Sequence, residues 1–208
     1  RVDAMKIKFN DIVFALDLAF AVSAQLATLL IGAFLNVAAV AFFAAPIRLI
    51  TFLGYPGLSL ANALAPRLAG DGGRLPDPRV LELSLRRLIV FQGLLLPPLI
   101  AWSEPIVRLL LGRHFAESAS VLRALVPYVF FAGLIPVVTL SMSYLGHAAL
   151  RLRISLVSIV LGVVLLLVLL PTAGLTGAAI ATGIDAAYLA LAHLWFLHSR
   201  AGLALAPL

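Results

Sequence analysis

The stretch ISLVSIVLGVVLLLVLL, residues 154–170, decides the fold class of this chain. It contains no charged residue and consists almost wholly of Leu, Val and Ile. At a rise of about 1.5 Å per residue, a helix of this length comes close to crossing a bilayer core of about 30 Å. Because lipid offers no hydrogen bonds to a backbone, such a segment spans a membrane as a helix. We therefore predict an all-α membrane fold in which this helix faces lipid.

The composition of the whole chain supports this prediction. Of 208 residues, 63% are hydrophobic and 12% are charged, whereas soluble domains have about 45–50% apolar and about 25% charged residues. A soluble core of this size cannot hide such an excess, because small domains keep much of their surface wet. The absence of cysteine excludes disulfides and thiolate chemistry. Nothing in the sequence offers the basic, aromatic face that nucleic-acid binding requires.

Six apolar segments are long enough to be spanning helices. We predict a polytopic helical bundle of about six transmembrane helices, forming a single lobe over residues 1–208. The predicted spans are Ile12–Phe34, Ala39–Asn62, Leu88–Trp102, Ala124–Leu145, Ile154–Leu170 and Gly177–Leu197. The paired prolines of the third span should bend or end it.

The connections between the predicted spans are short or polar. Residues 70–78 read as a turn-rich loop, and tight turns are predicted at Arg151–Arg153 and Pro171–Gly174. The segment Ser103–Arg123 carries several charged residues and should be wet, with Ser118 capping a short interfacial helix.

The distribution of Lys and Arg predicts the orientation in the membrane. With six spans, eleven of these residues fall on the side of the N-terminus and three on the opposite side, while Arg48 stays inside the second span. Cytoplasmic loops carry an excess of Lys and Arg. We therefore expect a multi-pass protein with both termini in the cytoplasm. The chain begins at Arg1 rather than at Met, and we expect it to be a fragment of a longer protein.

Ionisable residues inside a membrane are costly and therefore suggest function. Arg48 is the candidate for anion binding, because a guanidinium is always charged and its planar fork suits phosphate oxygens. Asp185 or Asp17 could bind a coupling cation or proton. The alternative is a structural Arg–Asp pair, with Asp17 simply reaching the interface. By helical rise, Arg48 should lie level with Gln25 and Asp185 near the middle of the membrane, whereas Asp17 is shallower.

Small and polar residues recur at helical spacing on three of the predicted spans, and such faces should turn away from lipid. We expect the first, second and sixth spans to form a cavity wall, with Arg48, Gln25, Asp185, Tyr55 and Asn62 lining a substrate path. The three faces consist of Asp17, Ala21, Ala24, Gln25, Thr28 and Gly32; of Arg48, Thr51, Tyr55, Ser59 and Asn62; and of Ala178, Ala181, Thr182 and Asp185.

Histidines near the end of the sixth span raise the possibility of a metal site. His193 and His198 are poorly spaced for one helical face and have no neighbouring carboxylate. With Trp195 between them, they are better explained as part of an interfacial belt with polar tips. No catalytic or nucleotide-binding motif is present. We therefore expect no enzyme activity, no metal and no cofactor.

Several segments resemble the C-terminal lobe of bacterial polysaccharide flippases, in the multidrug/oligosaccharidyl-lipid/polysaccharide exporter superfamily. IVRLLLGRHF at 106–115 with ASVLR at 119–123 is similar to that family's motif G-x-x-F…A…V-L-R. Leu145 and Gly146, followed by LLPTAGLTGAAIAT at 169–182, resemble its signature L-G…I-P-x-x-G-x-x-G-A-A-I-A-T. APIRL at 45–49 and ALAPR at 63–67 are similar to second-helix positions. The resemblance covers nearly the whole chain.

The resemblance implies two six-helix lobes around a central cavity in the bacterial cytoplasmic membrane. The implied cargo is an undecaprenyl-pyrophosphate-linked glycan for cell-surface polysaccharide or lipopolysaccharide biosynthesis. Arg48 matches a basic cavity position near the pyrophosphate, and the missing lobe would be an N-terminal lobe or a second copy. Two alternatives stay open: a cation-coupled multidrug antiporter of the same superfamily, in which Asp17 and Asp185 are the key residues, and a non-transporting half-protein or membrane scaffold.

Overall fold

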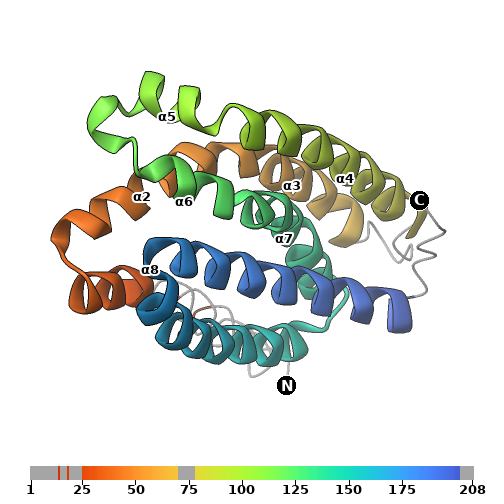
Figure 1. Ribbon diagram of the computed structural model, residues 1–208. Coiled ribbons are helices and arrows are strands. Elements are labelled where there is room, and N and C mark those ends of the chain that lie inside the picture. Colours follow the sequence, from red (N-terminus) through yellow and green to blue (C-terminus); the bar gives the residue numbers. More distant parts are fainter. Residues whose placement is uncertain (1–13, 15–17, 19–24, 70–77, 202–208) are drawn as a thin grey trace.

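A computed structural model of the chain describes residues 14, 18, 25–69 and 78–201, and all the regular structure within these residues is helical (Figure 1). Seven α-helices, α2 to α8, follow the helical segment Gln25–Phe34 there. Four helical segments are long and apolar enough to cross a membrane: Val37–Ala65, Arg79–Ala101, Val126–Tyr144 and Ala148–Ser199. The predicted all-α fold with several possible membrane spans is therefore confirmed.

The second predicted span contains a break in its middle. Helix α2 (Val37–Thr51) passes through a 3-10 turn, η1 (Phe52–Gly54), into α3 (Tyr55–Ala69). The break has a local cause, because Pro56 has no N–H to donate to the carbonyl of Phe52. The N–H of Tyr55 donates to that carbonyl instead, which tightens the helix at this point.

The third predicted span extends further toward its N-terminal end than expected. Helix α4 (Pro78–Ala101) includes Arg86, which pairs with Glu82 one turn earlier at 3.4 Å. The prolines Pro97 and Pro98 lie inside the helix, which ends three residues after the second. Charged side chains can occupy this first part because long side chains at helix ends reach the interface.

Short helices follow α4, and the serine predicted to cap one of them has another role. The chain continues through α5 (Ser103–Leu110), η2 (Arg113–Phe115) and α6 (Ser118–Ala124). Glu117 precedes α6 and makes no side-chain cap. The predicted capping role of Ser118 is therefore wrong; its side chain is fully buried and contacts α2.

Helix α7 (Val126–Tyr144) is the central element of the described structure and lies between α8 on one side and α3 and α4 on the other (Figure 1). Half of the most apolar stretch of α7 is buried, a larger share than in the other three possible spans. Gly133 allows this close packing, because a Cβ there would overlap the Gln92 side chain of α4. A Cβ on Gly57 of α3 would likewise overlap the Gly133 carbonyl.

Helix α8 (Ala148–Ala201) contains both the fifth and the sixth predicted spans. Gly174 interrupts it with φ 57° and ψ −141°, a conformation that favours glycine. The chain folds back there, so that α8 forms two arms, 148–173 and 175–201, that lie side by side (Figure 1). The turn predicted at Pro171–Gly174 is thus confirmed. The turn predicted at Arg151–Arg153 is wrong, because the chain already turns at Gly146, with φ +81°.

Most of the first half of the first predicted span, residues 12–24, lies outside the described residues. The last part of that span, Gln25–Phe34, is an apolar helix. A turn then leads into α2, where the Asn36 side chain accepts a hydrogen bond from the Ala39 N–H at 2.7 Å and caps the helix. Asp17 lies outside the part of the chain that the structure describes, so its predicted role stays a prediction.

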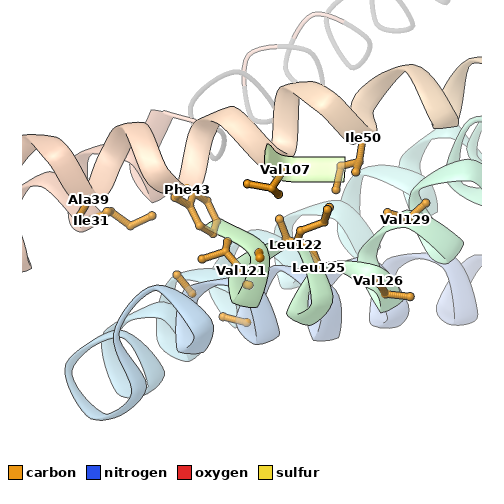
Figure 2. Packing of buried hydrophobic residues seen from close by; sticks show 14 of the residues in the cluster. Ile31, Ala39, Phe43, Ile50, Val107, Val121, Leu122, Leu125, Val126 and Val129 are labelled. Atoms are coloured by element: carbon orange, nitrogen blue, oxygen red, sulfur yellow. The ribbon is translucent and has the colours of Figure 1, made fainter. Parts of the chain in front are cut away.

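The buried side chains form two clusters along α7. One joins α2, α6, the start of α7 and the α8 turn, and Figure 2 shows Phe43 of α2 close to Val121 and Leu122 of α6 within it. The other joins the end of α7 with α3, α4 and the end of α8, through residues such as Leu85 and Leu197. Close packing of this kind drives helix association in membranes.

Candidate functional site

The polar residues of the second predicted span form an exposed face on α2, η1 and α3. Arg48, Thr51, Tyr55, Ser59 and Asn62 are all exposed, and we call this set the α2–α3 stripe. Tyr55 is 57% exposed, so its ring projects from the surface of the described structure. Thr51 donates only to the carbonyl of Ile47, one turn earlier, at 2.7 Å. The stripe therefore faces outward rather than into the core of the described structure.

Arg48 is the residue of this stripe with the strongest physical demand for a partner. It lies about 17 Å along the helix axis from Val37, near the middle of the span Val37–Ala65. In the described part of the chain it makes no hydrogen bond and no ion pair. A charged group at that depth is costly in hydrocarbon. Within a membrane, this guanidinium requires water, an anion or another protein surface.

Asp185 lies at a different place from Arg48. It is half-buried between the two arms of α8, where Ser158 Oγ donates to Oδ1 at 2.5 Å. A Cβ on Gly162 would lie 3.4 Å from the Asp185 carboxyl carbon, so this glycine leaves room for the carboxylate. The structural Arg–Asp pair considered above is therefore not formed between Arg48 and Asp185, since Asp185 bonds to a serine of its own hairpin.

The small face of the sixth predicted span is also buried within the helical bundle. Ala178 and Ala181 are almost inaccessible and belong to the core cluster around α6 and α7. Thr182 donates to the carbonyl of Ala178 at 2.9 Å. This face therefore packs against other helices of the bundle, whereas the α2–α3 stripe and Gln25 are exposed. The structure does not bring Arg48, Gln25 and Asp185 together through any hydrogen bond between described residues.

His193 corrects the interpretation of the histidines as an interfacial belt. Its side chain is fully buried, and Nδ1 lies 2.6 Å from the carbonyl of Leu189. Nε2 has no hydrogen-bond partner in the described structure. Trp195 and His198, by contrast, are exposed as the belt interpretation requires. The described residues contain no group of three or more potential metal ligands.

Two buried side chains bond to backbone carbonyls close to prolines, and the sequence patterns did not identify either role. Ser118 Oγ donates to the carbonyl of Phe42 at 2.8 Å. That carbonyl lacks its usual helical donor because Pro46, four residues later, has no N–H. The bond connects α6 to α2. Freed carbonyls in membrane helices are commonly satisfied in this way.

The second such side chain is Gln92 of α4, which is fully buried. Its Nε2 donates to the carbonyl of Leu53 at 3.3 Å. Leu53 lies in the 3-10 turn, and Pro56, three residues later, cannot donate to it. Gln92 also packs on Gly133, so α3, α4 and α7 meet around this amide. The single signal in the sequence is a lone Gln within an apolar run.

The site thus consists of an uncovered polar stripe with an unpaired arginine on α2–α3, and a separate covered set of polar groups inside α8. In comparisons with protein-family models, with curated proteins and with solved structures, nothing matched the chain.

Proposed function

We propose that this chain is a lobe of a membrane flippase that moves a lipid-linked glycan bearing a pyrophosphate. The observation that carries the proposal is Arg48, which is exposed at mid-span without a counterion among the described residues. A pyrophosphate supplies the missing anion, and a guanidinium binds phosphate oxygens through two parallel hydrogen bonds. The sequence resemblance to polysaccharide flippases supports the same cargo.

The rest of the stripe fits a path for such a cargo. Hydroxyl and amide groups follow Arg48 along one face, at Thr51, Tyr55, Ser59 and Asn62. These groups can replace water around sugar hydroxyls or phosphate without adding charge. Because the stripe faces outward, the path would lie between this lobe and a second lobe, supplied by an N-terminal half or a second copy. Binding between two lobes near mid-membrane is common in secondary transporters.

The proposed topology has six spans, with the two arms of α8 counted separately and Ile12–Phe34 as the first. With six spans, the excess of Lys and Arg on one side favours both termini in the cytoplasm, and the resemblance to bacterial flippases supports a bacterial cytoplasmic membrane. Under this topology the cargo would move from the cytoplasmic leaflet to the outer leaflet.

Binding of a fluorescent polyprenyl pyrophosphate to the purified full-length protein in detergent tests the proposal. Arg48→Gln should weaken binding by about 10- to 100-fold, because a hydrogen bond to a charged group contributes about 1.5–3 kcal/mol. Arg48→Lys keeps the charge but loses the planar fork and should give an intermediate affinity. The matched control is Arg153→Gln, which removes an exposed arginine near the start of α8.

Equal affinities of the Arg48→Gln and Arg153→Gln variants would reject the anion site. Polyprenyl monophosphate serves as the ligand control, since a pyrophosphate site should prefer the diphosphate.

A second function, cation-coupled multidrug antiport, is favoured by the position of Asp185. This carboxylate lies within a possible span and forms no ion pair in the described structure. Efflux of a cationic dye from proteoliposomes separates the two functions. Efflux that survives Arg48→Ala but is lost in Asp185→Asn would favour the antiporter, and a protein that neither binds polyprenyl pyrophosphate nor exports the dye would favour a scaffold.

A further inference from the structure

The two arms of α8 enclose polar side chains that the proposed cargo site does not use. Ser155, Ser158 and His193 are buried, and Asp185 is half-buried between the arms. On the first arm, Arg151, Ser155, Ser158 and Gly162 are spaced to share one helical face, and on the second arm Asp185 and His193 do the same. We call Ser155, Ser158, Asp185 and His193 the α8 seam.

The antiparallel arrangement of the arms orders these groups along the membrane normal. The bond from Ser158 to Asp185 fixes the register of the arms. His193 lies two turns beyond Asp185, about 12 Å along the axis, and is therefore level with Arg151, while Ser155 lies between the levels of His193 and Asp185. The seam thus runs from one end of α8 to the middle of the span.

The unsatisfied atoms of the seam are those that proton transfer requires. If Nδ1 of His193 donates to the Leu189 carbonyl, a neutral imidazole carries its free lone pair on Nε2. This atom and Ser155 Oγ are both buried without partners in the described structure. Water molecules bound along the seam, between His193 and Ser155, would satisfy both atoms. Buried polar groups that lack hydrogen-bond partners are energetically costly and suggest a functional role.

Other titratable groups around the seam are few among the described residues. Arg151 also donates to Ser143 Oγ on α7 at 2.8 Å. The His147 ring meets Phe196 edge-on, with ring centroids 4.9 Å apart. On α7, the backbone of Tyr128 lies beside Gly183, two residues before Asp185. The described residues form no ion pair with Asp185.

We infer that the α8 seam carries protons from the end of α8 at His193 to Asp185 in the middle of the span. A proton from water binds Nε2 of His193, which keeps its bond to Leu189. The Nε2 proton then passes through water between the arms to Oδ2 of Asp185, the carboxyl oxygen to which Ser158 does not donate. His193 returns to its neutral form, and Asp185 becomes a neutral carboxylic acid.

The role of this path rests on the proposed transport function, in which protonation of Asp185 would couple cargo movement to a proton gradient. The charge count assigns the His193 end to the cytoplasm. Neutralising a mid-membrane carboxylate removes a large part of its desolvation cost. Protonation of Asp185 would alter the contact between the two arms, which the hydrogen bond from Ser158 to Asp185 connects.

Time-resolved infrared difference spectroscopy of the purified full-length protein after a downward pH step tests the path without any cargo. The wild type should gain the band of a protonated carboxyl group, and Asp185→Asn should remove that component. His193→Gln should leave its final size unchanged and slow its appearance by on the order of 10²-fold, at the lower end of what a positioned proton-transfer group contributes. Glu117→Gln and His114→Gln, both at exposed positions, are the matched controls.

Ser155→Ala is a smaller change that should slow the same component, and it decides the matter if His193→Gln does not fold. A carboxyl band that Asp185→Asn leaves in place would overturn the inference. So would a rate that neither His193→Gln nor Ser155→Ala alters. Polyprenyl pyrophosphate binding is measured separately, so loss of the cargo proposal would leave this result intact, and the reverse also holds.

Discussion

The α2–α3 stripe and the outer face of α8 are both uncovered by the described chain, yet their chemistry is opposite. The stripe has Arg48 and four uncharged polar residues, whereas the exposed face of the first α8 arm has Val160, Val164 and other aliphatic side chains. Within the two arms of α8, Ser155, Ser158, Asp185 and His193 turn inward to the seam. We therefore predict that the exposed face of α8 contacts lipid, whereas the α2–α3 stripe contacts water or protein.

Single cysteines should separate these two environments with the largest effect. The chain has no native cysteine, so a thiol introduced near mid-span reports on its position alone. Thr51→Cys should react with a water-soluble maleimide in membranes on the order of 10² times faster than Val160→Cys. The thiolate is the reactive form, and lipid disfavours the thiolate by raising the pKa of the thiol.

Equal labelling of the two cysteines would remove the distinction between the faces. The relative rates after denaturation in detergent serve as the control, since both thiols are then accessible.

An added methyl group should lower the free energy of unfolding more on the inner face of α3 than at the kink beside it. Gly57→Ala places a Cβ against the Gly133 carbonyl and should lower the free energy of unfolding by about 2 kcal/mol, a typical cost of overpacking. Gly54→Ala is the matched control, because a Cβ there meets nothing within 4 Å. Denaturation in mixed micelles measures both, and equal stabilities would contradict the close α3–α7 contact.

Covered and uncovered hydroxyl groups should differ by a smaller amount. Ser118→Ala removes the bond to the Phe42 carbonyl and should cost about 1 kcal/mol, since hydrogen bonds between membrane helices contribute about 0.6–2 kcal/mol. Ser120→Ala, two residues later, removes an exposed bond to Glu117 and should be close to neutral. A loss for Ser120→Ala as large as that for Ser118→Ala would contradict the role assigned to the hydrogen bond between Ser118 and the Phe42 carbonyl.

Much of the fold could be predicted from hydropathy, because a lipid solvent leaves few choices to the backbone. The segments that became α7 and the second arm of α8 were identified within a few residues, and Gly174 marks the predicted turn. The first arm of α8 begins six residues before the predicted Ile154. The candidate site was predicted less completely. Periodicity identified which residues of α2 and α3 share a face, but the register of Ser158 against Asp185 depends on how two helices meet, which periodicity within one helix does not contain.

The roles of Gln92, Ser118 and His193 show the same limit. A lone polar residue in an apolar run can satisfy a freed carbonyl, face a cavity or reach the interface, and one-dimensional spacing does not distinguish these cases. The sequence by itself determined that the chain is helical and apolar enough for a membrane, because composition and hydrophobic length follow from transfer free energies alone. Only the tertiary structure decided which polar groups are covered and which stay exposed, because that depends on contacts between helices far apart in the chain.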